Sequence, residues 1–314
     1  MLQIKTMKKT NFSSLLVCCL IIFLATTFTF AQRRTNTRPA PKPKTIVFAV
    51  LQDGQTLEPI GVIDKGEIKE AGSGMDDTKA LTAFATIYYK PKTTYNLIFG
   101  GASSGTVTIK SSNTKAECGK NLAQITTISP KAKLKGLVMG LATNGKPAGI
   151  TTSFRRMPTF PERAEIEALV RAEFIKQGVS SDAVKNMKYH NLTALDVDAD
   201  GKAEMVGTFW AESSDKERNL LFFIAEKDAS GKYVFGHTDY SKVTPNEVMS
   251  VDLADLNDGL GHELLLDVLE ADGDKTSEIF TIAQAFEGNN FHVYSKRNGK
   301  WTRVFEGYNY HCAY

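Results

Sequence analysis

The sequence predicts a mainly β protein with a few helices, made of two β-rich domains, the C-terminal one built from two blade-like antiparallel repeats. Three observations lead to this prediction: β-branched and aromatic runs bounded by turn residues, few segments with helical spacing, and a loop-and-strand pattern that occurs twice after residue 190. The 314 residues fit about two domains. Hydrophobic residues at 42% and charged residues at 23% exclude a disordered, collagen-like or polytopic membrane chain. A net charge of +3 is too small to indicate a nucleic-acid partner.

Residues 1–31 have the pattern of a signal peptide. Three lysines precede an apolar run at 15–25, and Thr29 and Ala31 occupy the −3 and −1 places of a cleavage site. A membrane anchor is the alternative, but a spanning helix needs about 20 apolar residues, and threonines interrupt this run early. Cleavage would leave an exported chain, periplasmic or extracellular, that begins at Gln32.

Charge is distributed unevenly along the rest of the chain. Residues 32–44 carry five basic and no acidic side chains, and their prolines predict a disordered tether; a basic patch for an anionic surface is the alternative. Residues 45–156 have a net charge of +6, and residues 157–314 have a net charge of −11. We therefore expect a β-rich N-terminal domain at 45–156, a helical connector at 157–189 and a second β domain at 190–314.

Cysteine usage agrees with export. Cys118 and Cys312 remain after removal of the signal peptide, and two cysteines in an exported protein predict one disulfide. Such a bond would tie the first domain to the C-terminal tail, and chain entropy assigns it about 4–5 kcal/mol of stability. Two buried free thiols are the alternative, and no local motif pairs either cysteine with a histidine for catalysis.

The N-terminal domain contains apolar runs that predict strands and one run that predicts a helix. Asp76 and Asp77 precede the helical run, where their charges favour a helix N-terminus, and Pro91 ends it. The expected strands are 45–51, 59–63, 95–99, 106–109, 122–128 and 134–143, and the expected helix is 78–89.

The hairpin predicted at 95–109 contains Gly101, Ser103 and Gly105, which have the spacing of a hydrolase nucleophile elbow. An elbow needs a helix directly after the serine, whereas a β-branched run follows here. We therefore expect a glycine turn and no nucleophile.

The sequence of the connector predicts two helices that pack on a sheet. Thr159 can cap the first helix, which has a proline in its first turn, and Gly178 ends it. Ser180 or Ser181 can cap a short second helix at 182–188. Their apolar faces indicate packing and no separate function.

The most informative segment is an acidic loop with the pattern D-x-D-x-D-G-x-x-E. Acids at alternate positions direct their carboxylates into one turn, and Gly201 allows a sharp reversal of the chain. Hard oxygen ligands in a flexible loop suit Ca²⁺ better than Mg²⁺, and four like charges would repel one another without a cation. An acidic, solvated hairpin turn is the alternative. The candidate ligands are Asp196, Asp198, Asp200, the carbonyl of Lys202, and Glu204.

This loop differs from an EF-hand because its flanks predict strands and Gly207 stands where an EF-hand needs a glutamate. It resembles the calcium loop of FG-GAP repeats, the blade motif of integrin α-chain propellers and of many bacterial exported proteins. The resemblance covers residues 190–307. It implies a calcium ion held between two short strands of a β blade.

A partial copy of the loop lies about 56 residues further on, at residues 251–266. Strands follow both copies, but two units cannot close a propeller, so we expect a two-sheet assembly, a structure completed by a partner, or a divergent relative. A third acidic cluster, Asp272 to Asp274, predicts only a hairpin turn. A doubtful second metal site would use Asp255, Asn257 and Glu263.

These observations predict an exported calcium-binding β-repeat protein with a structural ion and a non-catalytic role in binding, adhesion or assembly. The expected partner is a protein or glycan ligand at the cell surface, with no nucleic acid and no transmembrane span after signal cleavage. We identify no catalytic residues. Two alternatives stay open: a secreted hydrolase whose site is assembled from sequence-distant residues, and a metal-independent structural module.

Overall fold

The computed structural model describes residues 43–71, 77–146, 154–248 and 252–312. The predicted signal peptide and most of the predicted tether lie outside these residues. The described fold is mainly β with helices at its margins, as the sequence predicts.

The first seven strands form a six-stranded closed barrel with one additional strand. Their order is β1-β7-β4-β5-β6-β2-β3, and β1 also pairs with β2, which closes the barrel and leaves β3 outside the ring. The strands are β1 (Thr45–Leu51), β2 (Thr56–Asp64), β3 (Glu67–Glu70), β4 (Thr94–Phe99), β5 (Ala102–Ser112), β6 (Ala123–Ile128) and β7 (Gly140–Thr143).

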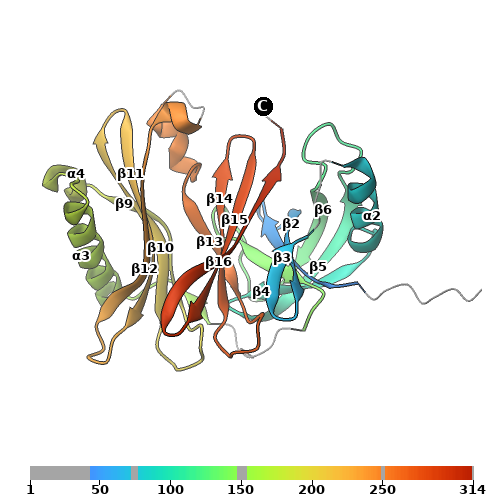
Figure 1. The fold of residues 1–314 in the computed structure, drawn as a ribbon, viewed down its shortest axis with the longest axis horizontal. Coiled ribbons are helices and arrows are strands. Elements are labelled where there is room, and N and C mark those ends of the chain that lie inside the picture. Colours follow the sequence, from blue (N-terminus) through green and yellow to red (C-terminus); the bar gives the residue numbers. More distant parts are fainter. Residues whose placement is uncertain (1–42, 72–76, 147–153, 249–251, 313–314) are drawn as a thin grey trace, which may run out of the picture. The chain divides into compact units, whose positions relative to one another are not determined.

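Strand β1 is buried on both faces, which explains its unbroken apolar sequence. Side chains alternate across a strand, so Phe48 points into the barrel core while Ala49 faces the neighbouring sheet. Helix α2 (Thr78–Tyr88) begins at the N-cap Asp77 and covers the barrel core with Phe84 (Figure 1). The N-terminal half is therefore a barrel with one covering helix, and the helix matches the sequence-based expectation within one residue.

Two antiparallel sheets follow the barrel. The five-stranded sheet has the order β12-β11-β10-β9-β8, and the four-stranded sheet has the order β13-β14-β15-β16. Two 3-10 helices, at Pro245–Val248 and Leu253–Asp258, lie between β12 and β13. The strands are β8 (Arg155–Arg156), β9 (Lys188–Leu195), β10 (Glu204–Ser214), β11 (Glu217–Lys227), β12 (Tyr233–Val243), β13 (Glu263–Leu269), β14 (Glu278–Ala285), β15 (Gly288–Arg297) and β16 (Lys300–Tyr310).

The sheets stack in layers and do not form propeller blades around an axis. Phe222 of the five-stranded sheet packs with Tyr294 of the four-stranded sheet in one apolar cluster. The opposite face of the four-stranded sheet packs through Phe280 on the outer wall of the barrel. Of the three arrangements that the sequence left open, the structure shows the two-sheet assembly.

Two helices cover the outer face of the five-stranded sheet (Figure 1). Helix α3 (Phe160–Lys176) starts with a capping box in which Thr159 and Glu162 satisfy each other's backbone amides. Helix α4 (Ser181–Lys185) has Ser180 as its N-cap. Both helices pack on the sheet, which confirms the role expected for the connector.

The glycine-rich hairpin is a turn, as the sequence predicts. Strands β4 and β5 pair antiparallel with Ser103 opposite Ile98, so no helix follows the serine. A Cβ atom at Gly105 would lie 2.2 Å from the carbonyl oxygen of Ile128, which excludes any side chain there.

One buried carboxylate connects the four-stranded sheet to strand β8 of the five-stranded sheet and to the barrel. Asp267 of β13 accepts a hydrogen bond from Arg155 of β8 at 2.7 Å, and the two side chains are 0% and 4% exposed. The amides of Gly100 and Gly101, in the β4–β5 turn of the barrel, each donate to the same carboxylate at 3.0 Å. A single carboxylate therefore joins three segments that lie far apart in the sequence.

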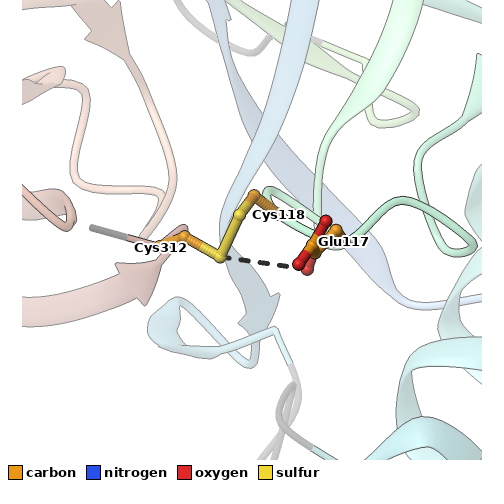
Figure 2. Close-up of a disulfide and its surroundings, with 3 residues drawn as sticks. All are labelled: Glu117, Cys118 and Cys312. Atoms are coloured by element: carbon orange, nitrogen blue, oxygen red, sulfur yellow. Dashed lines mark hydrogen bonds between the residues drawn. A yellow bond between two sulfur atoms is a disulfide. The ribbon is translucent and has the colours of Figure 1, made fainter. Parts of the chain in front are cut away.

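The predicted disulfide between Cys118 and Cys312 is present, with a Cα–Cα distance of 5.3 Å (Figure 2). Figure 2 also shows Glu117 beside the bond. The bond ties the β5–β6 connection of the barrel to the segment after β16. It closes a loop of 194 residues.

Replacing both cysteines by serine should lower the free energy of unfolding by about 5 kcal/mol, because the unfolded chain loses its longest constraint. Chemical denaturation of the wild type and the variant would measure this difference. A reducing agent should destabilise the wild type and leave the double-serine variant unchanged. Equal stability of the two proteins under oxidising conditions would contradict the prediction.

Substituting Arg155 by Met should cost about 3–5 kcal/mol, because it leaves the Asp267 carboxylate buried without its cation. The matched control is Arg163→Met, which breaks an exposed ion pair with Glu167 at 3.5 Å. Exposed pairs are worth about 0–1 kcal/mol, so the control should unfold nearly as the wild type does. Denaturation midpoints of the three proteins would test the difference.

Candidate metal centre

The first acidic loop, residues 196–204, connects β9 to β10 as the sequence predicts. Oxygen atoms of Asp196, Asp198 and Glu204 lie within 4.8 Å of one another. Calcium–oxygen distances are about 2.3–2.6 Å, so two ligands on opposite sides of one ion would be about 5 Å apart. The three carboxylates are therefore close enough to share one ion.

The backbone of the loop explains this convergence. Ala199 and Gly201 both have positive φ angles, of 58° and 81°, which reverse the chain twice within three residues. No atom lies within 4 Å of a Cβ built at Gly201, so its conformation and not the available space favours glycine. The amides of Asp200 and Gly201 donate to the carboxylate of Asp196, both at 3.1 Å.

One of the four predicted acids, Asp200, is not part of this group of three. Asp200 accepts a hydrogen bond from the backbone amide of Lys202 at 2.7 Å, and its carboxylate pairs with the Lys202 ammonium group at 3.2 Å. The amide and the ammonium group of Lys202 therefore both contact Asp200. The structure brings together three of the acids that the sequence selected.

Burial makes the first acidic loop electrostatically costly. Glu204 is only 6% exposed, and burial raises its pKa to about 8, with the nearby carboxylates of Asp198 and Asp196 adding to the increase. Burial also raises the pKa of Asp198. The ammonium group of Lys296, which pairs with Glu226 at 2.5 Å, partly offsets this by lowering the pKa of Asp198. A bound cation would remove the remaining cost.

A second acidic loop, residues 270–278, connects β13 to β14. Oxygen atoms of Glu270, Asp272 and Glu278 also lie within 4.8 Å of one another. From the sequence, Asp272 is expected only in a hairpin turn. Among the described residues, these two loops are the groups of three or more acids that could hold a metal ion.

The doubtful second site predicted from the sequence has other contacts. The segment that holds Asp255 is a 3-10 helix, and the side chain of Asp255 lies outside what the structure describes. Asn257 accepts a hydrogen bond from Arg218 at 2.8 Å. Glu263 is the first residue of β13 and accepts a hydrogen bond from Tyr294 at 2.8 Å. The loop in the equivalent place of the second sheet is therefore 270–278 and not 255–263.

A sequence signal for the second acidic loop exists, but it is hidden by substitutions. The four acids have the same spacing in both loops, with glutamate in place of the first aspartate and lysine in place of the turn glycine. The Asp-Gly pair near residue 258 matches the first loop more obviously, so the prediction from the sequence falls on residues 251–266 and not on this loop. The matching acids are Asp196, Asp198, Asp200 and Glu204 in the first loop and Glu270, Asp272, Asp274 and Glu278 in the second.

A cavity of about 350 Å³ lies away from both loops. Barrel residues such as Glu70 and Asn121 line it together with Tyr308 and His311 from the C-terminal segment. His311 forms an ion pair at 2.8 Å with Glu58, which is fully buried. This histidine therefore contributes to the contact between the barrel and the C-terminal segment.

Comparison of the chain with known protein families, with curated proteins and with solved structures found no match. The likeness to FG-GAP loops therefore stays a prediction from the residues. Within the described residues, no helix combines the length and the apolar character that crossing a membrane requires.

The Glu204→Gln variant should change how stability depends on pH in the metal-free protein. The pKa of Glu204 is about 8 in the folded state and 4.5 in the reference state, so the folded protein holds the extra proton. Wild-type stability should therefore fall, relative to the variant, as pH rises from about 4.5 to about 8. Denaturation in chelator at several pH values would measure this difference.

The control for that experiment is Asp228→Asn in the β11–β12 turn, where hydrogen bonds from Ser230 and Lys232 lower the pKa of the aspartate. A lowered pKa stabilises the folded wild type above the reference pKa. The variant lacks this contribution, so its stability relative to the wild type should fall as pH rises through the acid range. Parallel curves for wild type and Glu204→Gln would contradict the assignment of Glu204.

Proposed function

We propose that this chain is an exported protein whose first acidic loop binds Ca²⁺ as a structural ion, and that it acts in binding or assembly without catalysis. One observation carries the proposal. Oxygen atoms of Asp196, Asp198 and Glu204 gather within 4.8 Å of one another, although Glu204 is almost fully buried.

The chemistry of the donors supports calcium. Carboxylate oxygens are hard ligands, and a surface loop can adapt to the six to eight oxygens that Ca²⁺ takes. Mg²⁺ demands a stricter octahedron and gives up its water with difficulty. The ion would stabilise the fold because it binds the assembled loop and not the unfolded chain.

Two observations support export. The Cys118–Cys312 bond is consistent with an oxidising compartment, in which disulfides persist. The signal-peptide pattern at residues 1–31 agrees with the same location. The expectation of a protein or glycan ligand at a cell surface rests on the resemblance to FG-GAP repeats alone.

Two alternatives lead to different experimental results. A secreted hydrolase would use a pocket such as the 350 Å³ cavity near the disulfide, and substrate turnover would not depend on the acids of the first loop. A metal-independent module would have the same melting curve with Ca²⁺ and with chelator.

Ca²⁺ should stabilise the purified protein against thermal unfolding, by about 2.7 kcal/mol per site when free Ca²⁺ is at about 100 times the Kd. Asp198→Asn should remove the contribution of the first acidic loop because it removes one of three converging charges. Melting curves with Ca²⁺ and with chelator would measure both effects.

The matched control is Asp255→Asn, in the 3-10 helix, which should keep the full calcium response. A response of Asp198→Asn equal to that of the wild type would place the ion elsewhere. No response in the wild type would favour the metal-independent module.

A further inference from the structure

The second acidic loop repeats the first in its backbone. Positive φ angles occur at Ala199 and Gly201 and again 74 residues further on, at Gly273 and Lys275. Three hydrogen bonds from backbone amides to carboxylates recur at the same offset. The donor and acceptor pairs are Val197–Glu204, Asp200–Asp198 and Lys202–Asp200 in the first loop, and Ala271–Glu278, Asp274–Asp272 and Thr276–Asp274 in the second.

An independent observation distinguishes the second loop from an acidic turn. The atoms Glu270 Oε2 and Glu278 Oε1 are buried and have no hydrogen-bond partner, and neither does Ser295 Oγ. The three residues are 8%, 2% and 2% exposed. A buried polar atom without a partner costs about 1–3 kcal/mol, more when it is charged, so three in one place indicate a missing ligand.

Ser295 belongs to the same place as the two acids. It lies on β15 one residue beyond the pair Ile279–Tyr294, which sets it beside Glu278 on the adjacent strand. It lines a cavity of about 220 Å³ together with Asp272 and Glu278. The cavity therefore brings together two carboxylates of the loop and a hydroxyl oxygen from the neighbouring strand.

The charges around the two loops differ. In the first loop, the ammonium group of Lys296 lowers the pKa of Asp198 and forms an ion pair with Glu226. Glu226 lies beside Glu204 on the adjacent strand. In the second, the place beside Glu278 is held by the uncharged Ser295. The charged side chains that line the cavity around Asp272 and Glu278 are Glu67 of β3 and Arg297, which is exposed on β15.

Burial accordingly raises the pKa of Glu278 to about 8, with Asp272 and Glu270 adding to the increase. The pKa of Glu204 in the first loop is raised to about the same value. A bound metal cation would compensate the charge of such a buried carboxylate.

We propose that Glu270, Asp272, Glu278 and Ser295 form a second site for a hard divalent cation, with Ca²⁺ as its expected occupant. All four donors are oxygens, and the carboxylate oxygens lie within 4.8 Å of one another, which fits a shared ion. The site belongs to a different sheet from the first acidic loop and does not depend on Ca²⁺ binding there.

This site would also hold the barrel against the last sheet. Gly66, in the turn between β2 and β3, approaches the loop so closely that a Cβ atom there would lie 3.2 Å from the Cα of Asp272. Gly66, Glu67 and Ile68 line the same cavity. An ion at the second loop would therefore slow the opening of the β2–β3 hairpin.

Isothermal titration of the purified protein with Ca²⁺ would test the proposal. The wild type should bind two ions per chain, Glu278→Gln one and Asp198→Asn one, and the double variant none. The control Asp228→Asn alters an exposed aspartate whose carboxylate also accepts backbone amides, and it should bind two ions.

The outcomes separate the two sites. If Glu278→Gln binds as many ions as the wild type, this inference is wrong and the first site stands. If Glu278→Gln binds none while Asp198→Asn still binds one, the second site is supported and the function proposed for the first loop fails. If the wild type binds no Ca²⁺, both fail.

A second measurement guards against a folding defect in Glu278→Gln. In chelator this variant should melt as cooperatively as the wild type, because an amide is less costly to bury than a carboxylate. Ca²⁺ should slow hydrogen exchange of the β3 amides in the wild type and in Asp198→Asn, but not in Glu278→Gln. Equal slowing in Glu278→Gln would overturn the proposal.

Discussion

The assembly of this protein depends on one buried carboxylate. Asp267 sits fully buried on β13 and is held by Arg155 and by the amides of Gly100 and Gly101. Since an unpaired buried charge costs several kcal/mol, burial of the Asp267 carboxylate is favourable only when these groups are in place around it. This carboxylate thereby fixes the positions of the barrel, the short strand β8 and the four-stranded sheet. Its partners Gly101 and Arg155 both lie more than 100 positions from Asp267 in the sequence.

The stacking of two similar sheets places the two acidic loops near each other. The amide of Ser277 donates to the carbonyl of Val197 at 2.7 Å, so the end of one loop is hydrogen-bonded to the start of the other. Both loops are exposed at their tips. The first has Lys296 nearby, whereas Gly66 of the β2–β3 turn approaches the second.

A structural role for metal ions suits this arrangement better than a catalytic one. The acids accept hydrogen bonds from their own loop backbones, and their burial favours a neutral or metal-bound state. Together with the disulfide, ions at these loops would add links that do not depend on apolar packing. A protein outside the cell gains from such links because they stabilise its fold without enlarging its core.

The sequence alone determined the mainly β fold, the capped helices, the glycine turn at 100–105, the disulfide and the first acidic loop. Each follows from local signals: β-branched runs, cap residues followed by proline, turn residues, paired cysteines and acids at alternate positions. Only the tertiary structure decided that the barrel closes, that the sheets stack, and that Asp267 meets the β4–β5 turn, because pairing between distant strands leaves no local pattern. It likewise decided that the second acidic loop is at 270–278. The common centre of Glu270, Asp272 and Glu278, and the hydroxyl that Ser295 adds, exist only when β14 and β15 lie side by side.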